Sequence, residues 1–490
     1  MKQRCVNMSA ILLLGVGVLY ANDVSRSFLA IRPYAGQVMN QYQLLDQVYD
    51  NGRVLKMNSV QISLFGGSSF CADALARYFM FNGKSSLLVK NVQEAGGVVV
   101  NGQDILAGHF NFDPTGDTGY IGTISFAPKQ SFIGASISFK AHLPHHMWLA
   151  LELPVVYVKN NMHLTESISS PDSIEENSTW LDGNAPSRTM VDAFKRSGMR
   201  YGKIDGSRHS TGLADVTVKI GHDPVLLNRK DLHVSYNAGF VMPTSNKAKA
   251  IYVFEPIRGN GGHWALLGGC MAEMLLKSME HGHLWAQHRA EIQYLFHNTQ
   301  CRSLDFIING PWSRYLSLFP DENARASDTA ASTNRVSGIN IMTRDVLVTP
   351  GFQASFESTL SYIGQKYHGT FGWTLSALQG ESVRLKKPWT LGPQIADLAT
   401  ATRVTPYARI GGEVFNSGVT TTAIFIQESD IDLNSAARPA VLTNMIQAKV
   451  GRYWQNEHPV LCEVGSSVEV SKFNTAINRW SVWGTVNVAF

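Results

Sequence analysis

Charged side chains recur on one face of several stretches in this sequence, where polar residues alternate with apolar ones. Six of them are candidate lining groups of a water-filled space: Arg289, Glu291, Glu357, Arg409, Glu413 and Lys449. Both signs of charge are present among them. Charges that line a narrow aqueous passage create a field that sorts solutes by charge. The alternative is a ladder of salt bridges that hydrates an inner wall without selecting any solute.

Other kinds of site chemistry find little support in the sequence. It contains no GxSxG turn for a nucleophilic serine, no HExxH zinc helix, no phosphate-binding P-loop and no dinucleotide fingerprint. Several histidines gather near expected turns: His142, His145, His146, His222, His233, His281 and His283. Their spacing lacks the cysteine partners of a structural zinc site. We therefore expect no enzyme, no metal site and no cofactor.

Composition limits the class of protein further. The 42 basic and 38 acidic residues give a formal net charge of +4, and no run of like charge occurs, which argues against a nucleic-acid partner. After residue 21 no stretch approaches the roughly 18 to 20 apolar residues of a membrane-spanning helix. Strands of a transmembrane barrel need only about 9 to 11 residues each, so the sequence leaves a barrel open.

Residues 1–21 are typical of a secretory signal peptide. Lys2 and Arg4 form a positive start, residues 9–19 form the apolar core, and Ala21 ends a small-residue cleavage site. We expect export and a mature chain that begins at Asn22. Four cysteines remain after the signal: Cys71, Cys270, Cys301 and Cys462. In an oxidising compartment they could form disulfides or serve as small apolar residues, and both alternatives stay open.

The last strand-like segment alternates in character up to the final residue. One face holds Trp480, Val482, Gly484, Val486, Val488 and Phe490. A terminal aromatic residue preceded by apolar residues at alternate positions resembles the last strand of Gram-negative outer-membrane β-barrels. The resemblance implies a bacterial outer-membrane location, contact with outer-membrane lipids, and recognition of Phe490 as an assembly signal by the barrel-assembly machinery.

Similar alternation recurs in about fourteen segments. They lie near residues 118–127, 131–143, 146–158, 212–221, 231–242, 263–276, 283–297, 351–362, 366–378, 404–416, 419–428, 440–453, 459–472 and 479–490. This pattern predicts an all-β fold, a transmembrane antiparallel up-and-down β-barrel of about 14 strands (roughly 12 to 16) over residues 118–490. Residues 22–117 form an N-terminal segment that contributes either early strands or a plug in the lumen.

Short and long connections between the expected strands fall on opposite sides of the barrel. If the last strand runs inward, the connections assigned to the periplasmic side are short, including 363–366 and 454–458. Those assigned to the outer side include the long segments 159–211 and 298–350. Outer-membrane barrels have short periplasmic turns and longer outer loops, so this sorting supports a barrel over a β-sandwich.

The whole chain resembles barrels of the porin and solute-channel type. Within it, residues 212–219, 240–244 and the glycine-rich 259–262 are similar to barrels associated with export or uptake of aromatic and other hydrophobic compounds. The resemblance implies a channel or transporter for small solutes, with hydrophobic or aromatic compounds as one class. One alternative is a structural or adhesion barrel that acts through 159–211 and 298–350. The other is an outer-membrane hydrolase with its nucleophile near the outer rim.

Overall fold

The structure of the protein is a computed structural model. It describes residues 25–30, 47–50, 53–81, 83–91, 93–94, 98–99, 104–112, 120–170, 181–184, 187–223, 232–307, 310–319, 335–389, 394–395, 426–454, 457–472 and 475–490. The expected signal peptide, 1–21, lies outside these residues, and so does most of the two expected strands at 404–416 and 419–428. Within the described part no helix is long and apolar enough to cross a membrane.

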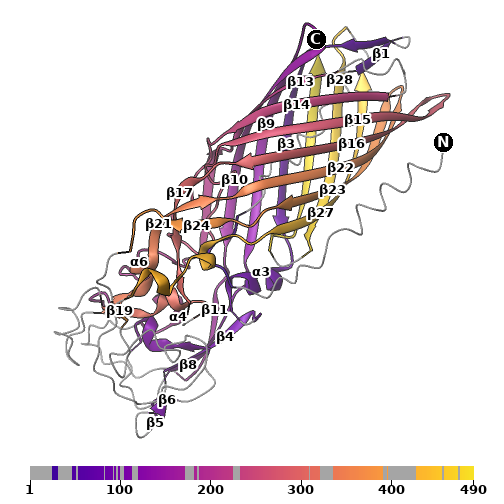
Figure 1. Ribbon diagram of the computed structural model, residues 1–490. Helices are drawn as coiled ribbons and strands as arrows, with labels where there is room; N and C mark the ends of the chain where they lie inside the picture. The colour runs from indigo at the N-terminus through magenta and orange to yellow at the C-terminus, as the bar shows by residue number, and fades with distance from the viewer. Residues whose placement is uncertain are drawn as a thin grey trace, which may run out of the picture.

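Twelve strands of the described chain form a closed antiparallel barrel (Figure 1). They are β3 (Ser59–Ser69), β9 (Lys129–Leu143), β10 (Met147–Asn161), β13 (Val216–His222), β14 (Leu232–Met242), β15 (Ala265–Met279), β16 (Gly282–Leu295), β22 (Gly351–Gly364), β23 (Tyr367–Leu378), β27 (Val441–Trp454), β28 (Val460–Ser471) and β29 (Arg479–Ala489). Each strand pairs with the next in chain order, and β29 pairs with β3 to close the ring. The predicted up-and-down barrel is confirmed, and twelve strands is the lower end of the predicted range.

The difference from fourteen has a structural reason. The expected strand at 118–127 is β8 (Tyr120–Ser125), which pairs with β4 (Ser86–Asn91) and β11 (Thr165–Ser170) outside the barrel wall. Its alternate residues face another apolar core, which the pattern could not distinguish from lipid. The wall passes directly from β23 to β27, which pair along their full length. One wall strand, β3, lies within the segment 22–117.

One wall segment is interrupted. β12 (Ser207–Leu213) and β13 both pair with the same side of β10, and a bulge at Ala214 and Asp215 separates them. The bulge lies opposite Pro154, whose carbonyl oxygen accepts a hydrogen bond of 2.9 Å from the Ala214 amide. Proline cannot donate to a strand ladder, so an irregularity at this point relieves the mismatch.

The outside of the barrel is apolar. Leu64, Ile133 and Val450 point outward and are more than 60% exposed, a surface that is stable only against lipid or a partner. Exposed aromatic side chains mark both ends of this band. Near the short turns they are Tyr362, Tyr367, Trp454 and Phe490, and near the other end they are Trp264, Phe296, Phe352 and Trp480.

Long connections gather at one end of the barrel, opposite the end where the chain terminates (Figure 1). We call their assembly the cap. Its elements are α3 (Ala72–Phe79), β4, β5 (Gln93–Glu94), β6 (Val98–Val99), β7 (Ile105–Leu106), η2 (Ala107–Phe110), β8, β11, α4 (Met190–Ala193), β17 (Asn298–Ser303), β18 (Asp305–Phe306), η3 (Ser313–Tyr315), β19 (Ser317–Phe319), β20 (Val336–Ser337), α6 (Gly338–Met342), β21 (Thr343–Thr349), β24 (Ser382–Leu385), β25 (Gln394–Ile395), η4 (Glu428–Asp430), β26 (Ile431–Asp432) and η5 (Leu433–Ala436). The opposite end carries short turns and the hairpin of β1 (Gln47–Asp50) and β2 (Arg53–Lys56).

Candidate functional site: the polar lumen and its cap

The inward positions of the strands are largely polar. Outward residues are the exposed apolar ones, so the alternation of each strand turns its polar residues into the lumen. Arg289, Glu291, Glu357 and Lys449 all occupy inward positions. Arg409 and Glu413, the other two candidates, lie outside the described residues.

Two ion pairs join the lumen groups of β13, β16 and β22. Arg289 Nη1 lies 3.9 Å from Glu357 Oε2, and Gln447 Nε2 donates a hydrogen bond of 2.7 Å to Glu357 Oε1. Lys219 Nζ lies 2.7 Å from Glu291 Oε2. Each acid of this group therefore has a basic partner, and the pairs run along the wall in the middle of the barrel.

The Lys219–Glu291 pair spans two intervening strands, β14 and β15. Gly239 lies directly opposite Lys219, and Gly269 lies directly opposite Glu291. Because glycine carries no side chain, these two positions leave space for the long side chains to meet above the sheet. The pair could not be inferred from the sequence, since its two members lie on strands that are three apart in the barrel order.

A second set of ion pairs lies on β23, β27, β28 and β29. Glu463 Oε1 lies 2.8 Å from Lys449 Nζ and 2.6 Å from His368 Nε2. Glu469 Oε2 lies 2.7 Å from Arg479 Nε. The six residues expected from the sequence did not include His368 and Arg479. Both stand at the inward positions of alternating strands, and this was the signal that could have found them.

The two sets differ in their access to solvent. Side chains of the Lys219, Glu291, Arg289 and Glu357 pairs are 10–15% exposed. Side chains of the second set are 3–5% exposed. The polar groups on β13, β16 and β22 can therefore act on a solute in the lumen, whereas those on β23 to β29 are packed into the wall.

The cap has a hydrophobic core of its own. Residues from all six connections at this end, five long ones and the short turn between β28 and β29, meet in it: Phe79, Phe194, Phe254, Trp312, Ala436 and Ile477. Edge-to-face packing of Trp312 with Phe81 and Phe194, at centroid distances of 5.9 and 6.2 Å, adds specific geometry to this core. The cap is consequently a packed unit rather than a set of separate loops.

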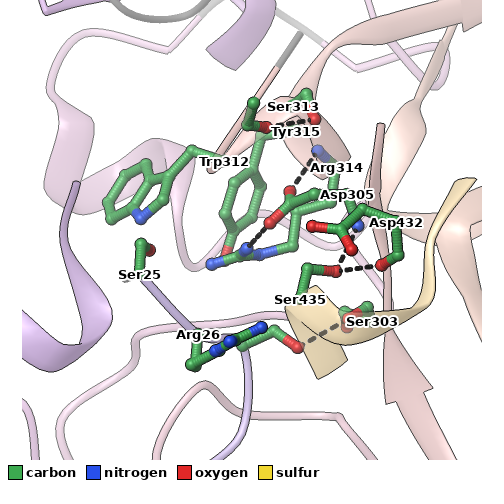
Figure 2. Close-up of polar contacts among 12 residues, drawn as sticks. Ser25, Arg26, Ser303, Asp305, Trp312, Ser313, Arg314, Tyr315, Asp432 and Ser435 are labelled. Atoms are coloured by element: carbon green, nitrogen blue, oxygen red, sulfur yellow. Dashed lines mark hydrogen bonds and ion pairs between the residues drawn. The ribbon is translucent and has the colours of Figure 1, made fainter. Parts of the chain in front are cut away.

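Polar contacts tie the N-terminal segment 25–30 into the cap (Figure 2). Ser25 Oγ donates to the Phe79 carbonyl oxygen at 3.1 Å, and Ser27 Oγ donates to the Ser303 carbonyl oxygen at 2.6 Å. The Ser27 amide donates to the Ser435 carbonyl oxygen at 3.0 Å. The start of the described chain thus bridges three long connections.

A buried ion pair lies beside this segment. Arg314 Nη1 donates to Asp305 Oδ2 at 2.6 Å, and the Arg314 amide donates to Asp305 Oδ1 at 2.9 Å (Figure 2). The Ser435 hydroxyl accepts a bond of 2.8 Å from the Asp305 amide. Both charges are at most 2% exposed, so loss of either partner would leave a costly buried charge.

Among the described residues no three histidine, cysteine or acidic side chains are placed to hold a metal ion. The four cysteines of the described residues are free thiols: Cys71, Cys270, Cys301 and Cys462. Burial raises the pKa of Cys301 to about 11, which keeps that thiol protonated at neutral pH.

A closed antiparallel wall with an apolar outside and a polar, charged inside defines a β-barrel of the outer-membrane type. The chain resembles Gram-negative outer-membrane barrels of the porin and solute-channel type. No family model and no curated protein matches the sequence.

Solved structures to which the chain is similar include the COG4313 outer membrane channel from Pseudomonas putida F1, at 9% identity and a TM-score of 0.37, covering 91% of this chain and 99% of that one. The TodX deltaS2S3 mutant monoaromatic hydrocarbon channel has 8% identity and a TM-score of 0.30, covering 92% and 94%. The NanC porin has 7% identity and a TM-score of 0.28, covering 73% and 93%. These values are low, and the barrel assignment rests on the strand pairing above.

Proposed function

We propose that this protein is a channel or transporter of the bacterial outer membrane that passes small solutes and has no enzymatic role. The observation that carries the proposal is the partly exposed set of charged pairs on β13, β16 and β22. Groups with both signs, accessible from the lumen, can hydrate and select a passing solute. Hydrophobic or aromatic solutes are one class, supported by the sequence resemblance in 212–219, 240–244 and 259–262.

Conductance of the purified, refolded protein in a planar bilayer tests this proposal. Wild-type protein should conduct, and Arg289→Glu should shift the reversal potential in asymmetric salt toward cations. In a hydrated lumen the change is worth about 1 kcal/mol, or several-fold in ion preference. If the protein folds into a barrel but does not conduct, the proposal of an open passage is wrong and the passage is closed.

A structural or adhesion role has one observation in its favour, the packed core of the cap. A surface domain of that kind can hold a partner without any passage through the barrel. This second candidate would be supported if the protein bound host or neighbouring cells through its cap and showed no conductance in a bilayer.

We also propose that Phe490 is the assembly signal. Its side chain is 48% exposed on the lipid side, and its amide donates a hydrogen bond of 2.9 Å to the Asn58 carbonyl oxygen beside the first wall strand. Deletion of Phe490 should lower the yield of folded barrel in cells, whereas Phe490→Tyr should preserve it. Equal yields for the deletion and for wild type would contradict this role.

A further inference from the structure

A small cavity lies where the cap meets the lumen. Its cap side is formed by Arg302, Glu381 and Arg438, and its lumen side by residues at the cap ends of β16, β22 and β23. Leu295 and Leu378 belong to that lumen side, and both are buried. The cavity therefore lies at the junction of the cap and the barrel, and the side chains of its three charged residues are only 1–3% exposed.

The charges around the cavity do not cancel. Glu381 lies between the two arginines: its Oε1 is 3.6 Å from Arg438 Nε, and its Oε2 is 3.4 Å from Arg302 Nη1. Glu381 is the only acidic residue among those that line the cavity in the described chain. Two guanidinium groups and one carboxylate leave a net charge of +1.

His263 also lines the cavity, and it does not alter this balance. Burial lowers its pKa to about 4, so the ring is neutral at pH 7. Its Nδ1 lies 2.8 Å from the Phe296 carbonyl oxygen and therefore carries the hydrogen, while its Nε2 accepts from Gln300 Nε2 at 2.8 Å. Gln300 in turn accepts two bonds from Arg302, at 2.6 and 2.9 Å.

The two arginines differ in how far their donors are used. Arg302 also donates to the Ala436 carbonyl oxygen at 2.9 Å, and its guanidinium lies over the Phe28 ring. Arg438 Nη2 donates to the Gln379 carbonyl oxygen at 2.8 Å, but Arg438 Nη1 is buried without a hydrogen-bond partner among the described residues. Arg438 is only 1% exposed, so an unpaired donor there is costly unless an anion or a water meets it.

We propose that this cavity binds the carboxylate of a small organic acid whose apolar body extends toward the lumen, with Arg438 Nη1 donating to a carboxylate oxygen. The unbalanced positive charge supplies the attraction. The apolar lining of Ile257, Leu295 and Leu378 suits an aromatic or aliphatic body. That such an acid is also a transported solute rests on the proposed channel function.

Titration calorimetry of the purified full-length protein with benzoate tests the site, with benzyl alcohol as the uncharged analogue. Benzoate should bind and benzyl alcohol should not compete with it. Arg438→Gln should weaken benzoate binding at least about tenfold, the usual loss for a charge-assisted hydrogen bond. Arg196→Leu, which removes a buried cap arginine that does not line this cavity, should leave binding unchanged.

A second variant keeps every charge. Ala30 lines the cavity, and Ala30→Phe fills the space without removing a polar contact, so it should also abolish benzoate binding. Equal benzoate affinity in wild type, Arg438→Gln and Ala30→Phe would overturn the site, as would equal binding of benzyl alcohol. Bilayer conductance of the same samples separates the two proposals: a protein that conducts but does not bind benzoate refutes only this one.

Discussion

At the scale of single residues, burial separates two roles for similar ion pairs. Lys449 and Glu463 are packed together at 4% exposure, where removal of one partner leaves an isolated buried charge and costs about 3–5 kcal/mol. Arg289 and Glu357 are more exposed and 3.9 Å apart, so water shares their charge and their loss costs less. Variants of the first pair should report on folding, and variants of the second on solute passage.

A buried histidine in the cap predicts a dependence of stability on pH. Burial lowers the pKa of His109 to about 3, and its Nδ1 accepts from the Ser317 amide at 3.2 Å. The unfolded chain gains this proton below about pH 6.5 and the folded cap does not, so stability falls as the pH drops from about 6.5 toward 3. Each pH unit in that window costs up to about 1.4 kcal/mol.

Urea unfolding at several pH values, followed by near-ultraviolet circular dichroism, measures this slope. Compared with wild type, His109→Gln should be less stable at pH 7 but lose less stability between pH 6.5 and 4. Parallel pH profiles of the two proteins would show that His109 is not the group responsible.

The sequence predicts which side chains point inward far better than it predicts which of them form ion pairs with one another. Alternation placed Arg289, Glu291, Glu357 and Lys449 on inward faces, because period two follows from strand geometry alone. The pairing of Glu291 with Lys219 depends on the strand count and on the glycines beneath it, which only the closed barrel reveals.

At the scale of elements, several large inward side chains lie opposite inward glycines on the neighbouring strand. Trp483 lies over Gly465, Trp148 over Gly221 and Phe65 over Gly134. A Cβ atom added at these glycines would lie 2.1 to 2.6 Å from the facing ring. Alternation of small and large residues lets the aromatic rings lie flat against the wall instead of filling the same space.

Gly465→Ala therefore tests this packing on β28. Its Cβ would lie 2.5 Å from the Trp483 ring, so the ring must move, at a cost of about 1–3 kcal/mol. Gly484→Ala on the neighbouring strand β29 is the matched control, because its Cβ would have no neighbour closer than 3.8 Å. The temperature at which the folded band is lost on a semi-native gel should drop for Gly465→Ala alone. An equal drop for both variants would refute the packing argument.

Strands could be predicted from the sequence where residues close in sequence alternate in polarity. The cap could not, because its contacts join residues that are far apart in the sequence. Eleven of the fourteen expected segments correspond to wall strands, and the twelfth wall strand, β3, lies in the N-terminal segment 22–117. The cap escaped detection because its core joins Phe79, Phe254 and Trp312, which are far apart in the sequence and carry no shared period. Its contacts are long-range, so no window of sequence contains them.

At the scale of the whole molecule, the sorting of connections predicts which end faces the outside of the cell. Long connections belong on the outer side of such barrels, so the cap should be exposed on intact cells. Lys195 and Arg200 are exposed trypsin sites in the cap, and Lys366 is an exposed site in a short turn at the opposite end. Trypsin added to intact cells should cut at Lys195 or Arg200 and spare Lys366. Cleavage at Lys366 with the cap intact would invert the orientation.

The unequal exposure of the two lumen sides also predicts where water and solutes run through the molecule. Gln293 on β16 points inward and is half-buried, whereas Ser481 on β29 points inward and is 3% exposed. In a background in which Cys71, Cys270, Cys301 and Cys462 are replaced by serine, a charged thiol reagent should modify Gln293→Cys quickly and Ser481→Cys slowly. Reaction at Gln293→Cys should also reduce bilayer conductance, because the bound group would stand in the path beside Glu291. If Ser481→Cys is modified quickly and Gln293→Cys is not, water and solutes pass along β29. Arg289 and Glu357 would then not line their route.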